Sequence, residues 1–185
     1  MIELAVFAQR RQAVMERLGS NAVLVVASLP ERLRTGDAQY AFRQHSDVLY
    51  LTGFGEPQTV VVLRPGAATE RYVLFVRPRD PEMETWDGRR AGTQGAQAMY
   101  GADAAYPISE LPTRLAGLIA NTDELHFALG LDDKLDQLLT STIAALRGRE
   151  KRGQRSPRAI VDPRYSLHEL RLCKGPEEID RKSVV

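Results

Sequence analysis

Several features that would place this chain in a chemical class are scarce or absent. Its single cysteine, Cys173, excludes an internal disulfide and fits a reducing compartment. The longest apolar runs, at 22–27 and 60–63, are far too short to cross a bilayer. Glu3 lies where a secretory signal would carry basic residues. We therefore expect a cytoplasmic protein with no membrane segment.

An excess of charge of either sign is also lacking. The 25 lysines and arginines nearly balance the 24 aspartates and glutamates, so a formal net charge of +1 gives no global field for nucleic acid or anionic lipid. One local excess of positive charge runs from Arg147 to Arg158. We interpret this basic run as a solvated helix end and loop, with carboxylate or interface contacts as the alternative. Nucleic acid is the least favoured partner, because no aromatic residue interleaves there for base stacking.

The sequence contains no pattern of a familiar catalytic centre. Its three histidines, His45, His126 and His168, are far apart and form no HExxH or HxH arrangement, which is weak evidence for a metal site. No GxSxG elbow and no glycine-rich phosphate loop is present. His45 belongs to a polar segment that suits a hydrogen-bond network, and we expect His126 to be a satisfied histidine beside the core. We predict neither a catalytic residue nor a metal ligand in this chain.

What the sequence does contain is a series of helix and strand patterns, in a length that suits one domain. Apolar residues from Leu4 to Leu18 recur at three- and four-residue spacing, which predicts an amphipathic helix ended by Gly19. The apolar run at 22–27 predicts a strand buried on both faces. Three further β-rich runs with short links follow, at 48–52, 59–63 and 72–76. We therefore expect the middle of the sheet to be antiparallel.

Capping signals mark the later helices. Asp80 and Pro81 predict the start of a short helix that Gly88 ends, and Asp132 opens the last helix. Ser109 is the expected cap for another. The remaining expected elements are helices near 94–100 and 111–119 and strands at 124–129 and 159–161. This interleaving predicts an α/β fold whose mixed, twisted sheet is flanked by helices on both faces.

Two stretches fit neither a core element nor a solvated loop. Residues 34–44 are too charged for the first and too rich in aromatic residues for the second. The only tryptophan, Trp86, ends the short capped helix and has charged neighbours. A lone tryptophan is most often a core anchor, whereas an exposed aromatic ringed by charges is typical of a contact residue. The sequence leaves both interpretations of Trp86 open.

A helix also begins close to residue 185. Gly175 suits the N-cap, Pro176 suits the first helical position, and two glutamates then face the positive end of the dipole. A helix of about ten residues is marginal in water unless it packs on something. We therefore expect a further part of the protein beyond residue 185, and we expect the chemistry to reside there.

Blocks of sequence spread over the whole chain carry a resemblance to a known family. They read FAQRR at 7–11, YAFRQ at 40–44, YLTGF at 50–54, ETWDGRR at 84–90 and HELRL with KGPEEI at 168–179. In this order they resemble the N-terminal domain of the bacterial aminopeptidase P (Xaa-Pro aminopeptidase) family. The resemblance implies that residues 1–162 form that domain, with a ribonuclease H-like motif. Residues 163–185 would then be a connector and the start of the first helix of a catalytic domain.

The resemblance implies that the chemistry belongs to that catalytic domain, of the pita-bread fold. There two manganese ions would polarise the carbonyl of an Xaa-Pro bond and lower the pKa of the attacking water. None of their ligands falls in this sequence, so we expect no cofactor in this chain. The partners implied are the protein's own C-terminal catalytic domain, further copies in a homo-oligomer, and a peptide substrate with proline second.

The resemblance also gives substrate-binding roles to a few residues of this chain. Trp86 would close the substrate groove of a neighbouring subunit, and Asp37 would lie near the ammonium group of the substrate. Tyr40 and Arg43 would support the same loop. Two alternatives stay open: the N-terminal domain of an Xaa-Pro dipeptidase, and a stand-alone protein-interaction module.

Overall fold

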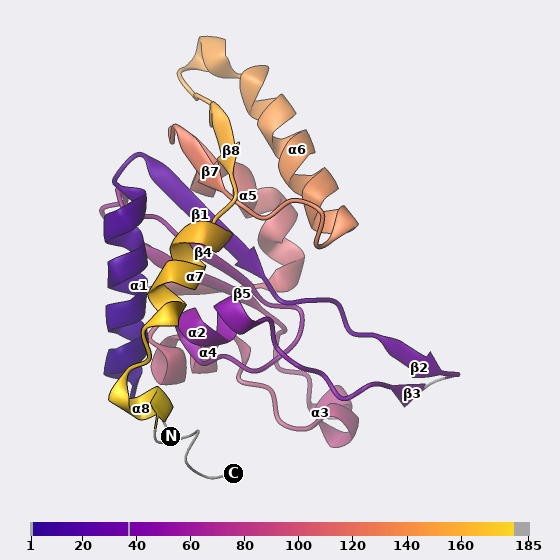
Figure 1. Cartoon of the computed structure of the whole chain (residues 1–185). Coiled ribbons are helices and arrows are strands. Elements are labelled where there is room, and N and C mark those ends of the chain that lie inside the picture. Colours follow the sequence, from indigo (N-terminus) through magenta and orange to yellow (C-terminus); the bar gives the residue numbers. More distant parts are fainter. Residues whose placement is uncertain (1, 37, 180–185) are drawn as a thin grey trace.

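The protein, described by a computed structural model over residues 2–36 and 38–179, is an α/β fold around one six-stranded sheet (Figure 1). Its strands are β1 (Ala22–Ala27), β4 (Val60–Leu63), β5 (Tyr72–Val76), β6 (Ala104–Pro107), β7 (Glu124–His126) and β8 (Ala159–Val161). Their order across the sheet is β6-β5-β4-β1-β7-β8. The pairs β1–β4 and β4–β5 are antiparallel, whereas β1–β7, β5–β6 and β7–β8 are parallel. The expected antiparallel middle of a mixed sheet is confirmed.

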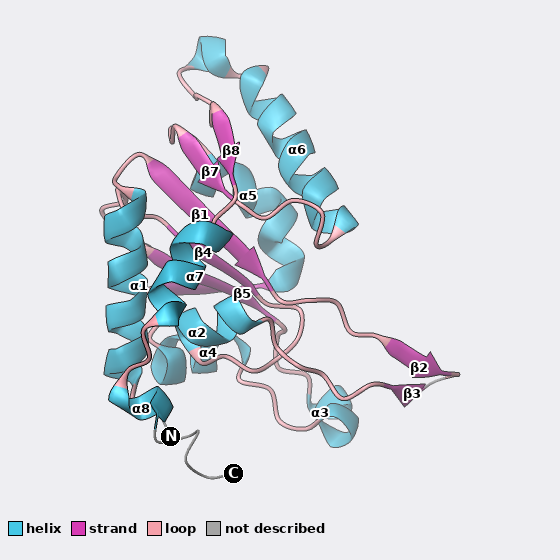
Figure 2. Ribbon diagram, viewed as in Figure 1, coloured by secondary structure: helices cyan, strands magenta, loops and turns pink. Residues whose placement is uncertain are grey.

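Helices cover both faces of this sheet (Figure 2). They are α1 (Leu4–Leu18), α2 (Ser46–Thr52), α3 (Pro81–Asp87), α4 (Gly92–Tyr100), α5 (Leu111–Ile119), α6 (Asp133–Arg147), α7 (Arg164–Leu172) and α8 (Pro176–Ile179), with 3-10 turns η1 (Ile108–Glu110) and η2 (Glu150–Arg152). Apolar side chains of α5 and α6 form the core on one face, and those of α1, α2, α4 and α7 form it on the other.

The central strand β1 shows why both faces are buried. Val23 and Val25 contribute to the core under α5 and α6, while Leu24 and Val26 contribute to the opposite core. Successive side chains of a strand point to opposite faces, so a continuous apolar run fits a strand covered on both sides. The strand expected from this run is confirmed with its bounds.

One expected strand is a helix. Residues Val48–Thr52 form most of α2, and the prediction of a strand there was wrong. Asp47, Val48, Leu51 and Thr52 are buried while Leu49 is exposed, which is a helical pattern of burial. Gly53 then ends the helix in the left-handed conformation, at φ 69°.

Three smaller features of the structure also differ from what the sequence predicts. Ser109 does not cap a helix, because it lies inside η1, and α5 begins at Leu111 without a side-chain cap. The edge strand β6, with the sequence AAYP, was not expected, because it lacks β-branched residues. An exposed hairpin of β2 (Leu33–Thr35) and β3 (Ala38–Gln39), also unexpected, projects from the molecule (Figure 1).

The expected connector is not separated from the domain by a break in packing. Helix α7, which follows β8 directly, places Leu167 in the core under α1 and α2. Helix α8 then begins at Pro176, as the capping signals predict. Among the described residues, no helix has the length and apolar character needed to span a bilayer.

Candidate functional site

The segment 34–44, which the sequence left without an assignment, forms the β2–β3 hairpin and the chain that leads from it to α2. Tyr40 is exposed, its backbone N–H donates to the carbonyl of Arg32 at 3.0 Å, and the guanidinium of Arg34 lies 6.0 Å from the centre of its ring. The expected substrate contact Asp37 lies outside the described residues. The hairpin therefore presents an aromatic ring beside positive charge at the surface.

Two of the expected site residues lie together in one groove. Tyr40 and Arg43 both line it, with Arg32, Gln44 and His45. The floor of the groove is fixed because the Gln44 amide donates to the carbonyl of Glu56 at 2.7 Å and accepts the backbone N–H of His45 at 2.8 Å. This groove therefore has a polar floor held by buried Gln44 and a rim of exposed side chains.

Trp86 lies on a separate element, the short helix α3. The Asp80 carboxylate accepts the backbone N–H groups of Glu82 and Met83 at 3.1 and 3.2 Å, which caps the helix as the sequence predicts. Trp86 itself is 86% exposed. The core-anchor interpretation of this residue is therefore wrong, and the indole is free to contact another molecule.

Helix α3 is braced against the chain that precedes it. The Arg79 guanidinium donates two hydrogen bonds of 3.0 Å to the Glu84 carboxylate. This pairing lowers the pKa of Glu84, mainly through the hydrogen bonds, and raises that of Arg79. A bidentate pair fixes geometry as well as charge, so Trp86 is presented on a helix with a defined orientation.

Glu56 connects the groove to the segment after α3. Its carbonyl accepts the amide of Gln44, while its carboxylate accepts the backbone N–H of Ala91 at 2.7 Å and lies 3.7 Å from Arg77. Trp86 is not among the residues that line the groove. The structure thus brings Tyr40 and Arg43 together in one groove and places Trp86 outside its lining.

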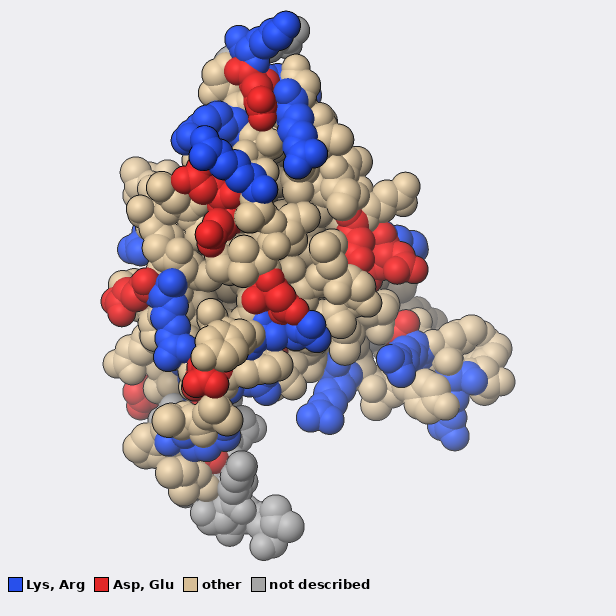
Figure 3. Space-filling view, turned by 45° about the horizontal axis from the view of Figure 1, so that its top comes forward, with Lys and Arg blue, Asp and Glu red and all other residues tan. Residues whose placement is uncertain are grey.

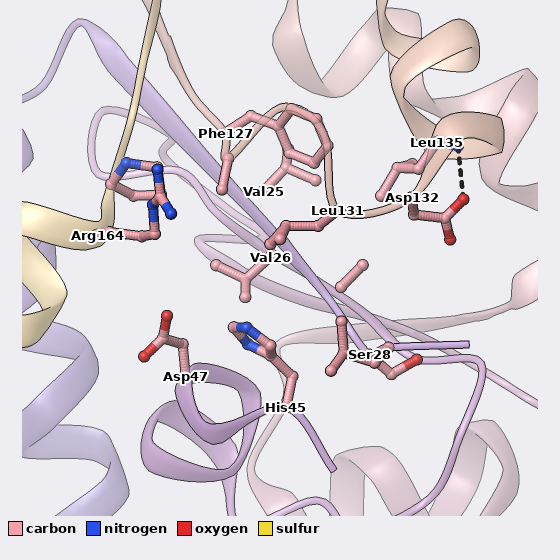
Figure 4. A pocket seen from close by; sticks show the side chains of 14 residues that line it. Val25, Val26, Ser28, His45, Asp47, Phe127, Leu131, Asp132, Leu135 and Arg164 are labelled. Atoms are coloured by element: carbon pink, nitrogen blue, oxygen red, sulfur yellow. Dashed lines mark hydrogen bonds between the residues drawn. The ribbon is translucent and has the colours of Figure 1, made fainter. Parts of the chain in front are cut away.

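A second polar cluster lies where α7 crosses α2. The Arg171 guanidinium donates to the Asp47 carboxylate at 2.6 Å, and His168 Nε2 lies 4.0 Å from the other oxygen of Asp47. Burial lowers the pKa of His45, Asp47 opposes that shift, and Arg171 and His168 lower the pKa further. Figure 4 shows His45 and Asp47 at one wall of a small cavity, with Arg164 of α7 on another side.

This cluster was not predicted from the sequence. Asp47 and Arg171 are 124 positions apart, and no local pattern relates them. Asp47 can be singled out only once residues 46–52 are known to form a helix, because it is then the charged residue on the buried face of that helix. The expected hydrogen-bond network around His45 is not found among the described residues: Gln44 accepts its backbone N–H and Asp47 pairs with Arg171, but the buried Nδ1 of His45 has no hydrogen-bond partner there.

The remaining candidates have local partners. Within residues 2–36 and 38–179, no three His, Cys, Asp or Glu side chains converge as metal ligands, so the described residues do not fit a manganese pair. His126 is buried on β7, with Nε2 2.9 Å from the Glu124 carboxylate. In the basic run, Arg155 and Arg158 are exposed and lie 3.8 and 4.0 Å from Asp123. Figure 3 shows positive and negative side chains interspersed at that end of the molecule.

The sequence matches the family model described as "Aminopeptidase P, N-terminal domain" over residues 7–126. It is 37% identical to the Xaa-Pro aminopeptidase of Escherichia coli over 174 residues, which are 94% of this chain and 40% of that protein. It is 33% identical to human Xaa-Pro aminopeptidase 3 over 170 residues, 90% of this chain and 33% of that one. The chain thus spans about two fifths or less of these relatives.

Solved structures are similar over nearly the whole chain. The aminopeptidase of Pseudomonas aeruginosa superposes with a TM-score of 0.92 at 40% identity, covering 97% of this chain and 40% of that one. The low-pH form of aminopeptidase P from E. coli gives a TM-score of 0.91 at 36% identity, with coverage of 97% and 41%. On the family match and these similarities, the chain belongs to the family of aminopeptidase P N-terminal domains.

Proposed function

We propose that this chain is the N-terminal domain of an Xaa-Pro aminopeptidase and that it supplies part of the rim of the substrate groove. Its relatives are named for that activity and extend well beyond the length that it matches. The observation that carries the proposal is the position of Trp86. A tryptophan left 86% exposed on a capped and braced helix contributes nothing to the core, but it provides a rigid apolar surface for a ligand or partner.

In this proposal each rim residue has a distinct task. Trp86 packs against the substrate in the groove of a neighbouring subunit, which requires a homo-oligomer. Asp37 attracts the substrate's N-terminal ammonium, because opposite charges interact strongly in a partly desolvated groove. Tyr40 and Arg43 support that loop from the groove that both line.

Bond cleavage is assigned to a further domain. The described residues offer no cluster of metal ligands, so the proposal places the expected manganese pair with the catalytic domain that would follow this chain. We also propose a cytoplasmic location, for which the single cysteine is the support.

A peptidase assay tests the assignment of bond cleavage to the further domain. The 185-residue chain, supplied with manganese, is expected to release no N-terminal residue from an Xaa-Pro-Xaa peptide. The enzyme encoded by the complete gene is expected to release it. Release by the chain alone would overturn the assignment of the chemistry to another domain, and failure of the complete enzyme would overturn the substrate class.

The role of Trp86 is tested in the same enzyme. Trp86→Ala is expected to lower kcat/KM by about five- to thirtyfold, since a rigid aromatic contact is worth on the order of 1–2 kcal/mol. Met83→Ala, on the same helix and also partly exposed, is the matched control and should leave turnover unchanged. Equal effects of the two variants would show that helix α3 matters and that the indole does not.

A further inference from the structure

Helix α7 is attached to the domain by few apolar contacts. Leu167 is its only fully buried side chain among the described residues, and Leu170 is partly buried. Tyr165 and Leu172, on the outer face, are largely exposed. Burial of one leucine stabilises the attachment of α7, but it fixes neither the rotation of the helix about its axis nor its position along that axis. The polar contacts of α7 therefore decide its orientation.

The strongest of these contacts is made to Asp47. This carboxylate is only 3% exposed, yet it lies on the face of α2 that contacts the core. Arg171 donates to it at 2.6 Å from the last turn of α7. Removing a carboxylate from water is costly unless a cation and hydrogen bonds compensate. The first-turn position of Asp47 in α2 supplies part of this compensation through the helix dipole, and Arg171 of α7 supplies the cation.

Helix α2 does not need this carboxylate for its own attachment. Val48 and Leu51 are fully buried under the sheet, and the Arg11 guanidinium donates to the carbonyl of Leu51 at 2.9 Å. An apolar side chain at position 47 would serve the packing of α2 as well or better. The charge at this position is therefore explained by the start of α2 and by its partner on α7, and not by the core.

Helices α1 and α2 also contact the end of α7 and the helix α8 that follows it. The Tyr50 hydroxyl donates to the carbonyl of Leu170 at 3.3 Å. Arg10 lies with its guanidinium 4.5 Å from the centre of the Tyr50 ring and 3.4 Å from the Glu178 carboxylate of α8. The contacts of Asp47, Tyr50 and Arg10 together form what we call the α7–α8 clamp.

We propose that Asp47 is a positioning residue that, through Arg171, sets the orientation of α7 and hence the direction in which the chain continues at α8. This inference rests on the proposed function, in which α8 leads into the catalytic domain. Asp47 would then help to set the distance between the groove rim on this domain and the reacting atoms on the other. The buried pair contributes orientation, while Leu167 contributes most of the stability of the attachment.

The test is amide hydrogen exchange in the 185-residue chain, which requires no activity. Asp47→Asn is expected to speed exchange of the 164–172 amides by at least about tenfold, with β1 amides unchanged. Arg171→Gln should have the same effect, and the double variant should add nothing further. Asp162→Asn is the matched control, because it removes the charge of an exposed pair with Arg164 at the start of the same helix but keeps the side-chain oxygen that accepts the backbone N–H of Arg164.

Two results would overturn the proposal. One is unchanged exchange in 164–172, and the other is an equal acceleration in β1, which would make Asp47 a core residue like any other. Arg171→Gln decides the question by itself if Asp47→Asn does not fold, because Arg171 is only partly buried.

The consequence for catalysis is measured separately in the complete enzyme. A positioning role predicts that Asp47→Asn lowers kcat more than it changes KM, and that Asp162→Asn changes neither. A loss confined to KM would refute the positioning role. Absence of Xaa-Pro aminopeptidase activity in the unsubstituted enzyme would refute the proposed function alone, since the exchange result does not depend on it.

Discussion

The exposure of Trp86 has a consequence for stability that can be calculated. At 86% exposure, Trp86 withdraws only about 14% of its surface from water, which is roughly 35 Å² for a side chain of about 250 Å². At about 25 cal/mol per Å², that area stabilises the fold by less than about 1 kcal/mol. Alanine also has a slightly better helix propensity, by a few tenths of a kcal/mol, which offsets part of the loss.

We therefore expect Trp86→Ala to lower the free energy of unfolding by less than about 1 kcal/mol. Phe75→Ala is the control, because Phe75 on β5 is 0% exposed and truncation of a buried aromatic costs about 3–5 kcal/mol. The measurement is urea unfolding followed by far-UV circular dichroism, since Trp86 is the only tryptophan and its removal abolishes the usual fluorescence signal.

A loss in Trp86→Ala as large as that in Phe75→Ala would refute the exposed position and restore the core-anchor interpretation. A small loss in stability together with a large loss in turnover is the combination that the rim proposal requires. Stability and activity thus have to be measured on the same protein preparation.

The remaining predictions concern backbone space, charge and a helix cap. A Cβ at Gly66 would clash with the carbonyl oxygen of Ser20, so Gly66→Ala should lower the midpoint of thermal unfolding. A Cβ at Gly117 in α5 would meet open space, so Gly117→Ala should stabilise the fold by up to about 1 kcal/mol in the same measurement. Because burial lowers the pKa of His45, the unfolded chain binds a proton there first, and stability should fall as pH drops below about 6.5. His45→Gln should reduce that slope in urea midpoints measured across pH; an unchanged slope would assign it to other groups. Asp132→Ala should cost about 1 kcal/mol, because the carboxylate caps α6 at two backbone N–H groups; an unchanged midpoint would contradict this.

The parts of the fold that could be predicted were those with a local cause. Asp80 and Asp132 both cap helices where the sequence places them, because a carboxylate and the amides that it accepts are neighbours in the chain. The error at Val48–Thr52 arose because valine, leucine and tyrosine suit a strand equally well, and only tertiary burial of one helical face decides between them. Strand β6 has weak propensity and exists because β5 offers an edge.

The candidate site divides in the same way. Trp86 could be selected as a candidate contact residue because it is the only tryptophan and has charged neighbours. Its exposure could not be predicted from the sequence. Asp47 and Arg171 could not be paired, because they meet only after the chain has built the sheet between them. Glu56 likewise acquires its importance from two partners that lie on different loops.

The order of the strands also bears on how the protein is made. Strand β1 pairs on one side with β4, which follows soon after it, and on the other with β7, where Val23 meets Leu125. During synthesis the four strands β6-β5-β4-β1 can therefore pair early, but one edge of β1 stays open until β7 emerges. An unpaired apolar strand invites pairing with other chains. We expect the interval between synthesis of β4 and of β7 to be the period in which the nascent protein most needs a chaperone.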